Sequence, residues 1–446
     1  MKNKLKKIVW IILLGILECS VLFAGNPIIP NISMADPHIH IFNNMAYLYS
    51  TRDADSTAHK FVMPDWKIWS SKDLVNWKLE RTINPRETYM GQSNRCWAPD
   101  VACKNGSWFF YFSNGNSNTG VLKGSSPTGS FVDILGKPLL TEDLTTGKEY
   151  DPTVLVDDDG IAYIAFGHYR ADDKNLNYYI AKLGSDMMSL TEKPKVIKII
   201  GDADILTGND KPTLHKRNGI YYLSAGTHYA TAKNIYGPYI RRGNSGNDEY
   251  GLNARAHGNY FEWRNQWFHI WCDFYLGKEV AYYRKSYLTY LHYKDNGEMV
   301  DDVAFLNAHF AIGVGKYDAS WDKIEAEWYM AADKIQKREC FYGGFEIQHV
   351  KNNGSLYFPN MKNLDKSSSI TFHLSSVSSG TIEVRANSKN GPVLGSVKVS
   401  GTGGYVNYKN ISCNLSKTQG INDIYLIFKG KSDDLFHLDW FKFELK

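Results

Sequence analysis

The chain has little of what marks the more specialised classes of protein. Its 446 residues include only six cysteines and no Cys-X-X-Cys pair, so neither a disulfide framework nor a zinc site is supported. The formal net charge is only +4, too small to indicate a nucleic-acid-binding protein. Charged residues make up 22% and hydrophobic residues 43%, which excludes intrinsic disorder, and the composition also excludes a collagen, a coiled coil or a polytopic membrane protein.

Long apolar runs are also scarce, and the one at the N-terminus is short. It covers Ile8–Leu17, follows a basic segment and is followed by a small residue at Ala24. This order is typical of a secretory signal peptide over residues 1–24 and predicts a secreted or periplasmic protein. The run is too short for a stable membrane span, and Glu18 follows it directly. The alternatives are an uncleaved anchor and a lipoprotein attached at Cys19, although Glu18 stands where a small residue is needed.

Cleavage after Ala24 changes both the charge and the cysteine count. It removes four lysines and one glutamate and leaves a formal charge of +1. It also removes Cys19 and leaves five cysteines, most of which we expect to be buried small hydrophobes. Cys96 and Cys103 could pair across a loop in an oxidising compartment, and the sequence leaves this open.

Aromatic residues, in contrast, are abundant at 14%, and they recur in a repeated pattern. A turn residue is followed by an alternating, aromatic-rich segment at five places, about 46 to 62 residues apart. The five segments are Asn44–Ser50, Gly106–Ser113, Gly160–Gly167, Gly219–Gly226 and Asn265–Cys272. Each is typical of a β-strand that follows a turn. Units of this length with several strands each are typical of propeller blades, so we predict an all-β fold with a five-bladed β-propeller; a pair of β-sandwiches is the alternative.

One polar residue precedes each aromatic segment by six to nine positions. The five are Asp36, Asp100, Asp151, Asp210 and His257. The first strand of each propeller blade lines the central channel, so groups in phase with the repeat would meet at one mouth of that channel. Carboxylates gathered in one pocket repel each other and raise some of their pKa values, as a general acid and a general base require. The alternative is that each Asp-Pro pair only marks the start of a strand.

Longer motifs accompany these residues in a fixed order. They are ADPHI (Ala35–Ile39), SKDLVNW (Ser71–Trp77), WAPDV (Trp97–Val101), YDPTVLVDDDG (Tyr150–Gly160), LHKRNGIYYLS (Leu214–Ser224), AHG (Ala256–Gly258) and YYRKSYLTYLHYKDNGEM (Tyr282–Met299). Over roughly residues 34–315 the chain resembles glycoside hydrolase family 43, five-bladed propeller enzymes acting on arabinose-, xylose- and galactose-containing polysaccharides. Each motif alone is moderately specific, and their order makes them specific together.

The resemblance implies an inverting mechanism with three carboxylates and no organic cofactor. Asp36 would be the general base that activates water, and Asp151 would orient the acid and tune its pKa. The acid of the family is a Glu, and Asp210 stands at that position. In inverting enzymes the acid and base carboxyl groups are about 6.5–9.5 Å apart, which admits the water.

Asp210 departs from the family pattern, and three interpretations stay open. An Asp is one methylene shorter than a Glu, so its proton would lie further from the glycosidic oxygen. Lys211 would lower the pKa of a carboxyl that it faced, but strand alternation predicts that these two side chains point to opposite faces. We expect Asp210 to be the acid. Otherwise a loop carboxylate such as Glu142, Glu149 or Glu249 serves, or the propeller binds sugar with little hydrolysis.

Four further residues take roles from the same resemblance. His257 matches a channel His that in many members helps to hold a central cation, with a hydrogen-bonded core residue as the alternative. Arg284 matches an Arg near the substrate, where a guanidinium could grip sugar hydroxyls and hold Asp151 ionised. Trp97 offers an apolar platform for a sugar face, and Asp100 is expected to shape the substrate pocket with it.

The sequence pattern changes after Tyr317. Short alternating segments between Ser- and Gly-rich turns continue to the C-terminus. They predict a β-sandwich of the jelly-roll type over residues 318–446 and leave residues 25–317 to the propeller. Four motifs, EAE (Glu325–Glu327), IEVRANS (Ile382–Ser388), LGSVKVSGTGGY (Leu394–Tyr405) and LDWF (Leu438–Phe441), resemble carbohydrate-binding module family 6 in their order.

This second resemblance implies a calcium site and a sugar site. Glu325, Glu327 and Asp439 match a structural calcium site, and carboxylate oxygens suit calcium; an exposed acidic edge is the alternative. The family holds a sugar between two aromatic rings, and Tyr405 stands at the second position while His349 occupies the first. A purely structural module, or a sugar site on another face, therefore stays open.

These observations together predict a secreted, inverting glycoside hydrolase with a carbohydrate as its partner. Its expected substrates are arabinofuranosyl, xylosyl or galactosyl linkages of plant-type polysaccharides or their oligosaccharides. A sugar-binding propeller with little or no hydrolysis is the alternative, and residue 210 separates the two. A propeller that serves as a scaffold for protein partners would need no set of channel carboxylates.

Overall fold

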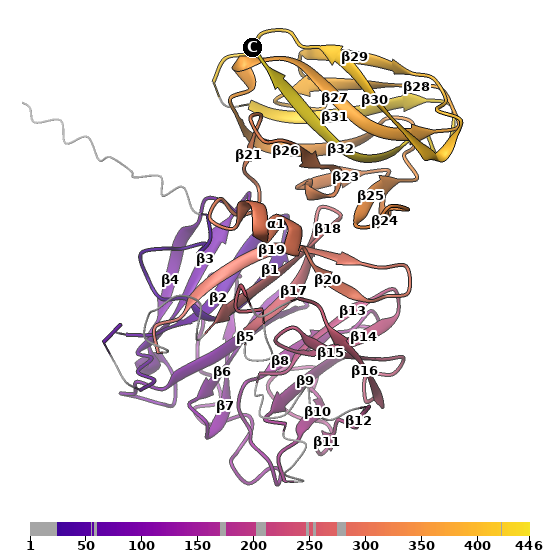
Figure 1. Ribbon diagram of the computed structural model, residues 1–446. Helices are drawn as coiled ribbons and strands as arrows, with labels where there is room; N and C mark the ends of the chain where they lie inside the picture. The colour runs from indigo at the N-terminus through magenta and orange to yellow at the C-terminus, as the bar shows by residue number, and fades with distance from the viewer. Residues whose placement is uncertain are drawn as a thin grey trace, which may run out of the picture.

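The computed structural model describes residues 25–54, 56–57, 60–169, 175–201, 211–246, 249–252, 256–273, 282–420 and 422–446. About 52% of the chain is strand and 4% helix, which confirms the all-β prediction. A propeller of five sheets carries a two-sheet sandwich at one end (Figure 1). Within the described ranges no helix is long and apolar enough to cross a membrane. The predicted signal peptide and Asp210 lie outside these ranges.

The five propeller sheets correspond to the five predicted repeats. Blade 1 contains β1 (Ala35–Phe42), β2 (Met45–Arg52), β3 (Asp65–Ser71) and β4 (Lys78–Ile83); blade 2 contains β5 (Cys96–Lys104), β6 (Ser107–Asn114) and β7 (Asn118–Gly124). Blade 3 contains β8 (Thr153–Val156), β9 (Ala162–Gly167), β10 (Tyr178–Lys182) and β11 (Lys195–Val196). Blade 4 contains β13 (Thr213–Arg217), β14 (Ile220–Ala225), β15 (His228–Ala232) and β16 (Tyr239–Asn244), with β12 (Ile199–Ile200) parallel to β16. Blade 5 contains β17 (His257–Trp263), β18 (Gln266–Asp273), β19 (Lys285–Tyr293) and β20 (Met299–Asp301).

Two-residue turns close the first hairpin of four blades. Both residues of each turn have a positive φ: Asn43 and Asn44, Asn105 and Gly106, Asn218 and Gly219, Arg264 and Asn265. Two consecutive positive φ angles are typical of a type I′ turn, whose twist matches that of the flanking strands and which Asn and Gly favour. The aromatic strand after each turn is therefore the second strand of its blade, which is why the repeat could be seen in the sequence.

Aromatic side chains fill the spaces between blades. Trp66 of blade 1 is fully buried against Phe110 and Phe112 of blade 2, at ring-centroid distances of 5.7 and 4.9 Å. Burying one such ring contributes about 1.5–3 kcal/mol. Most of the aromatic excess therefore belongs to the core.

The first strands of the blades, β1, β5, β8, β13 and β17, contact one another in a closed ring around the channel. They belong to different sheets, so buried side chains supply the links between them. His38 Nδ1 lies 2.7 Å from Asp100 Oδ1 and joins β1 to β5. The other oxygen of Asp100 accepts the Val154 amide at 2.7 Å and joins β5 to β8. Thr153 Oγ1 accepts the Leu214 amide at 3.3 Å and joins β8 to β13.

Two further links complete this ring, which we call the channel belt. Thr213 Oγ1 donates to the Gly258 carbonyl at 2.8 Å and joins β13 to β17. Asn259 joins β17 to β1 through two bonds of 2.9 Å, one from the Ile39 amide and one to the Ile39 carbonyl. Only glycine fits at position 258, because a Cβ there would lie 1.8 Å from the Ile270 carbonyl oxygen.

The C-terminal domain is a sandwich of two sheets. One sheet has the order β21 (Tyr317–Asp318), β26 (Gly354–Lys362), β31 (Asn422–Gly430), β28 (Gly380–Ala386) and β29 (Val393–Val399), with β23 (Ala331–Asp333) beside β26. The other has the order β24 (Gln336–Glu339), β25 (Phe345–Gln348), β32 (His437–Leu445), β27 (Ser367–Ser376) and β30 (Gly404–Asn414), with β22 (Ile324–Glu325) beside β32. The sandwich thus begins beside the predicted domain boundary.

Buried polar contacts fix the sandwich to the propeller. The one α-helix of the described residues, α1 (Val303–His309), connects the two domains and is capped by the Asp302 carboxylate, which also accepts Trp328 Nε1 at 2.6 Å. Gln266 of β18 donates to the carbonyls of Glu327 and Tyr329 at 2.7 and 2.9 Å. The five described cysteines are free thiols, including Cys96 and Cys103 of β5.

Removing the Asn259 side chain should destabilise the protein. The Asn259→Ala change leaves the amide and carbonyl of Ile39 without partners inside the propeller, which costs about 2–5 kcal/mol. Urea unfolding monitored by tryptophan fluorescence would measure this loss. The matched control is Asn410→Ala, whose exposed side chain bonds only the His373 ring among the described residues. An equal, small effect of both variants would contradict a belt that holds the blades together.

Candidate active site in the propeller channel

Asp36 lies at the start of β1 and is 3% exposed. One of its oxygens is 2.7 Å from His257 Nδ1 and accepts Arg284 Nη1 at 2.9 Å. Burial alone would raise the pKa of the Asp36 carboxyl, but Arg284, His257 and Lys211 outweigh burial and hold this pKa well below its ordinary value. Asp36 is therefore a carboxylate at neutral pH.

Arg284 lies before β19 of blade 5 and connects that blade to blade 1. Besides its bond to Asp36, Arg284 donates three hydrogen bonds to the Asp53 carboxylate. They come from Nη2 at 2.9 Å, from Nε at 3.1 Å and from the backbone amide at 2.8 Å. The guanidinium also lies over the Phe61 ring, 5.1 Å from the ring centroid. Sequence reasoning found Arg284 but missed Asp53, because Asp53 follows the second strand of its blade and is out of phase with the repeat.

Asp151 stands two positions before the first residue of β8 and is 2% exposed. Its backbone amide donates to Ser113 Oγ at 2.8 Å, which fixes its position against blade 2. Asp36, Asp151 and Lys211 each precede a proline and have φ values of 49°, 57° and 56°. A residue before proline normally adopts an extended conformation with negative φ. Left-handed strain of this kind gathers at functional sites, and it recurs here in three blades.

A cavity of about 270 Å³ opens over these carboxylates. Asp36, Asp151, His257 and Arg284 line it together with three aromatic residues, Phe61, Trp97 and Tyr150, and with Met63, Asn116 and His168. Aromatic walls around a few convergent polar groups are typical of a small-ligand site. Four of the five predicted first-strand residues are described by the structure, and Asp36, Asp151 and His257 meet in this cavity.

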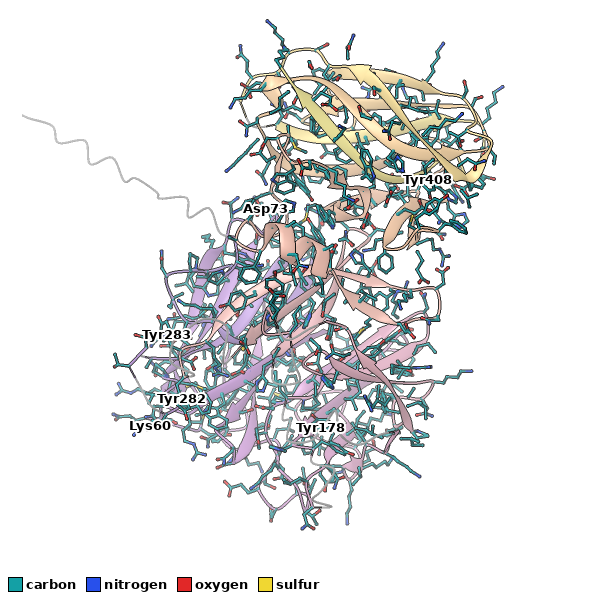
Figure 2. All side chains as sticks on the ribbon, viewed as in Figure 1. Lys60, Asp73, Tyr178, Tyr282, Tyr283 and Tyr408 are labelled. Carbon is teal, nitrogen blue, oxygen red and sulfur yellow. The ribbon has the colours of Figure 1, made fainter. Side chains whose placement is uncertain are left out.

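The aromatic wall continues to the mouth of the cavity. Phe61 meets Trp97 edge-on at 5.7 Å and Tyr282 at 4.8 Å, and Figure 2 shows Tyr282 on the propeller, far from Tyr408 of the sandwich. Tyr150 Oη lies 3.1 Å from His168 Nδ1. Phe61 and His168 come from connections between strands, and no repeat in the sequence marked them.

Comparison with known proteins matches both domains. Residues 24–299 match the model of glycosyl hydrolases family 43, and residues 325–445 match that of carbohydrate binding module family 6. The chain belongs to glycosyl hydrolase family 43. It is therefore a glycoside hydrolase, as its sequence predicted.

Relatives in family 43 cover nearly the whole chain. An arabinoxylan arabinofuranohydrolase of Paenibacillus polymyxa is 28% identical, over 94% of this chain and 74% of its own length. Another, of Bacillus subtilis (strain 168), is 27% identical over 94% of this chain and 92% of its own length. The crystal structure of a Bacillus subtilis family 43 arabinoxylan arabinofuranohydrolase in complex with cellotetraose has a TM-score of 0.58 at 24% identity and covers 95% of this chain and 98% of that chain. It shows the same two-domain fold.

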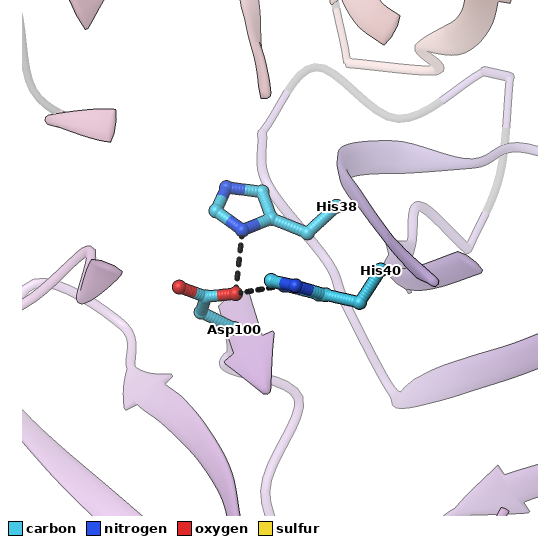
Figure 3. Close-up of side chains that lie close together, drawn as sticks. All are labelled: His38, His40 and Asp100. Atoms are coloured by element: carbon cyan, nitrogen blue, oxygen red, sulfur yellow. Dashed lines mark hydrogen bonds and ion pairs between the residues drawn. The ribbon is translucent and has the colours of Figure 1, made fainter. Parts of the chain in front are cut away.

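Asp100, expected at the substrate pocket of this family 43 propeller, lies deeper in the channel. It is 1% exposed, and its Oδ1 contacts both His38 Nδ1 and His40 Nε2 at 2.7 Å (Figure 3). The ligand atoms of these three residues lie within 4.8 Å of one another, close enough to share a metal ion. Burial is the main cause that lowers the pKa of His38 to about 4, so its imidazole is neutral.

The described residues of the channel line two separate cavities. A second cavity, of about 340 Å³, opens at its other end and is lined by residues further along the same strands, among them His40 and Leu155. His38, Asp100 and Lys211, each 1% exposed, fill the space between this cavity and the one over Asp36. We call these three residues the channel plug.

Lys211, expected to point to the opposite face from Asp210, does not line the cavity over Asp36. It is buried and donates from Nζ to the Pro99 carbonyl at 3.1 Å. Alternation does not apply because β13 begins only at Thr213 and Lys211 has a left-handed backbone. Asp210 itself lies outside the described residues.

The three loop carboxylates considered as alternative acids do not line the cavity over Asp36. Glu149 is buried and accepts the amide and hydroxyl of Thr145, and burial raises its pKa. Glu142 accepts Asn118 Nδ2 at 3.4 Å, and Glu249 is exposed. In the part of the chain that the structure describes, Asp36 and Asp151 are the carboxylates of this cavity.

The predicted calcium ligands of the sandwich form one electrostatic group. Burial is the main cause that raises the pKa values of Glu325, Glu327 and Asp439; Asp439 adds repulsion for the two glutamates, and Glu346 adds repulsion for Asp439. Glu327 Oε2 is buried without a hydrogen-bond partner among the described residues, while Lys323 pairs with Glu325 at 2.5 Å. A buried carboxylate oxygen without a partner among the described residues suits a hard cation such as calcium, although these three carboxylates do not form a group whose ligand atoms all lie within 4.8 Å.

Tyr405, the predicted sugar-contacting residue of the sandwich, already stacks on another ring. Its centroid lies 4.0 Å from that of His437, with 14° between the ring planes. Glu346 and Asp434 hold His437 protonated and raise its pKa to about 9, although burial acts against this. His349 stands at the other expected position, and its Nδ1 lies 3.7 Å from Asp434 Oδ2. One face of Tyr405 is thus covered within the domain.

Loss of the Asp53 carboxylate should lower the stability of the protein. The Asp53→Ala change leaves the buried Arg284 guanidinium with one carboxylate fewer and is expected to cost about 3–5 kcal/mol of stability. Calorimetric unfolding would measure it. The control is Asp295→Ala, which breaks an exposed ion pair with Arg338 and should change stability by about 0–1 kcal/mol. A small loss for Asp53→Ala would show that Arg284 does not depend on this anchor.

Proposed function

We propose that the protein hydrolyses arabinofuranosyl linkages of arabinoxylan-type polysaccharides or their oligosaccharides, with inversion at the anomeric carbon. The observation that carries the proposal is the convergence of Asp36 and Asp151 with Arg284 around one small cavity. The names of two relatives that align with 94% of this chain support arabinoxylan as the substrate class.

Asp36 is placed to act as the general base. A base must be ionised before it can accept a proton, and Arg284 and His257 keep the Asp36 carboxyl in that form. Asp36 takes a proton from a water whose oxygen attacks the anomeric carbon. The bond from that carbon to the glycosidic oxygen breaks on the opposite face of the sugar.

Asp210 is the proposed general acid. It gives its proton to the departing glycosidic oxygen, which leaves as the hydroxyl of the remaining glycan. Asp151 orients this acid, and its negative charge raises the pKa of a neighbouring carboxyl. Arg284 binds Asp36 directly, so it orients the base, and it lines the cavity in which the sugar would lie.

The cavity has the size of one sugar unit. Its volume of about 270 Å³ is below the range of about 300–1,000 Å³ that holds drug-sized ligands. Trp97, Phe61 and Tyr150 offer apolar faces on which a furanose or pyranose ring can lie. A site of this size suits the removal of single side-chain or terminal sugars. Xylosyl and galactosyl groups are the competing substrates of similar size.

Secretion and calcium binding complete the proposal. Residues 1–24 would direct the chain out of the cytoplasm, where polysaccharides are accessible. Calcium would be held by Glu325, Glu327 and Asp439 and would neutralise their repulsion, which makes it a structural ion of the sandwich.

Hydrolysis and both proposed carboxylates can be tested together. Purified protein is assayed on aryl α-L-arabinofuranoside, β-D-xyloside and β-D-galactoside, and on arabinoxylan, arabinan and galactan oligosaccharides. We expect fastest turnover of the arabinofuranosyl substrates and a loss of about 10²–10⁴-fold in kcat/KM for Asp36→Asn and for Asp210→Asn. Proton NMR of the first product anomer checks inversion.

The control for both variants is Asp186→Asn, an exposed carboxylate of blade 3. It should retain wild-type turnover. Full activity of Asp210→Asn would reject Asp210 as the acid. Sugar binding without turnover in the wild-type protein would favour a non-catalytic, sugar-binding propeller, and preference for the xyloside would make the protein a xylosidase.

Calcium should reverse the pH dependence of sandwich stability. Without the ion, the raised pKa of Glu327 means that the folded protein binds a proton more readily than the unfolded one, so stability falls as pH rises from about 4.5. With calcium the carboxylates are paired, and stability should rise over the same range. Calorimetric scans with EDTA and with CaCl₂ measure this.

The matched variants for this experiment are Glu327→Gln and Glu444→Gln. The first should abolish the calcium effect on the unfolding temperature, and the second, at an exposed position on β32, should leave it unchanged. An identical unfolding temperature with EDTA and with calcium at every pH would reject the site.

A further inference from the structure

Two histidines of β1 and one aspartate of β5 form a compact group in the channel, which we call the histidine cluster. His38 and His40 are two residues apart on the strand, so both side chains point to its channel face. Asp100 comes from the next blade, and its Oδ1 lies 2.7 Å from His38 Nδ1 and 2.7 Å from His40 Nε2 (Figure 3). Side chains of two blades thus bring three donor atoms to one point.

The donor atoms of the histidine cluster have the spacing of a metal site. All three lie within 4.8 Å of one another, and no other group of three His, Cys, Asp or Glu side chains in the described ranges does so. Zinc–ligand bonds of about 2.0–2.1 Å in a tetrahedron place the ligand atoms about 3.3 Å apart. The two N···O distances of 2.7 Å therefore need to open by about 0.6 Å to admit the ion. Three protein ligands leave the fourth position to water.

The chemistry of the cluster favours a transition metal. Calcium and magnesium take oxygen ligands, whereas imidazole nitrogen suits zinc, nickel and copper. The His40 side chain is 25% exposed and lines the cavity of about 340 Å³ at the far end of the channel, so an ion can reach the cluster from that side. The cluster is distinct from the cation expected beside His257, whose Nδ1 lies 2.7 Å from Asp36 Oδ1.

The buried charges of the channel also call for a cation. Six charged side chains along it are each at most 3% exposed: the carboxylates Asp36, Asp53, Asp100 and Asp151 and the cations Lys211 and Arg284. Four negative charges against two positive ones leave an excess of two among the described residues. Burying unbalanced charge is costly, and one divalent ion would remove this excess. Protonated imidazoles are the other source of positive charge.

We propose that His38, His40 and Asp100 bind Zn²⁺ or a similar divalent transition metal, a structural ion that links blade 1 to blade 2 within the channel belt. The ion replaces the two hydrogen bonds between the rings and Asp100 Oδ1, while Asp100 Oδ2 keeps the Val154 amide. The site does not depend on the proposed function, because none of its three ligands lines the cavity over Asp36.

The first experiment titrates the metal-free protein with Co²⁺ in excess CaCl₂, which occupies the carboxylates of the sandwich. Four-coordinate Co²⁺ with nitrogen ligands absorbs visible light far more strongly than hydrated Co²⁺, and coordination geometry is diagnostic of ligand type. We expect a visible band that saturates at one Co²⁺ per chain and is lost when Zn²⁺ is added. The absence of such a band in the folded wild-type protein would overturn the proposal.

The matched variants exchange one histidine ring for a phenyl ring. His40→Phe keeps a ring beside Phe42 but has no ligand atom, so it should lose the Co²⁺ band. The control is His373→Phe in the sandwich, where the His373 ring stacks on Tyr408 and Trp440; it should keep the band. An equal band in both variants would place the metal elsewhere and reject the histidine cluster.

Ring-nitrogen NMR gives a test that needs no variant. In wild-type protein labelled with ¹⁵N-histidine, Zn²⁺ should shift Nδ1 of one ring and Nε2 of another, the mixed pattern that the cluster requires. Zn²⁺ at about a hundredfold excess over its Kd should also raise the unfolding temperature by about 5 °C. Histidine signals that respond to pH but not to Zn²⁺ would overturn the proposal and assign the missing positive charge to protonated imidazoles.

Discussion

The channel belt is the constraint on which the rest of the molecule depends. Five inner strands of separate sheets meet around one axis without a shared backbone ladder, and buried polar side chains join each strand to the next. Because these bonds are internal and directional, they set the height of every inner strand along the channel. This alignment of the strands therefore fixes the positions of the carboxylates at the strand starts.

The ion pairs of Arg284 strengthen the same ring where blade 5 meets blade 1. Blade 5 meets blade 1 where Arg284 bridges Asp36 and Asp53, so the contact that closes the propeller also orients the proposed base. The left-handed backbone at Asp36, Asp151 and Lys211 aims three side chains toward the axis. Such strain persists only where surrounding structure determines it, and the belt directly below supplies that support.

The sequence predicted the parts of the site that follow the repeat. The type I′ turns and aromatic strands made the blades recognisable in the sequence. Asp36, Asp151 and His257 were found because each precedes its aromatic strand by a similar number of residues. Asp53 and Phe61 were missed because they come from connections, whose course depends on tertiary packing and not on a period. The relative orientation of Asp210 and Lys211 stays a prediction, because Asp210 lies outside the described residues.

Asp100 shows a different limit of sequence reasoning. Its phase matched the catalytic positions, yet its carboxylate ties three inner strands together and contacts His40. A repeat reveals that a residue lies on the channel, but its height in the channel decides whether it meets substrate or neighbouring strands. On β1, Asp36 lines the cavity, whereas His38, only two residues later, contacts a neighbouring strand in the plug.

The plug also determines how ligands travel. Among the described residues, His38, Asp100 and Lys211 are buried along the channel beneath Asp36 and do not line its cavity. If these side chains close the inner end of the cavity, a released sugar leaves on the side from which the next glycan enters. Product and substrate would then compete for one cavity, and accumulated free sugar would slow hydrolysis.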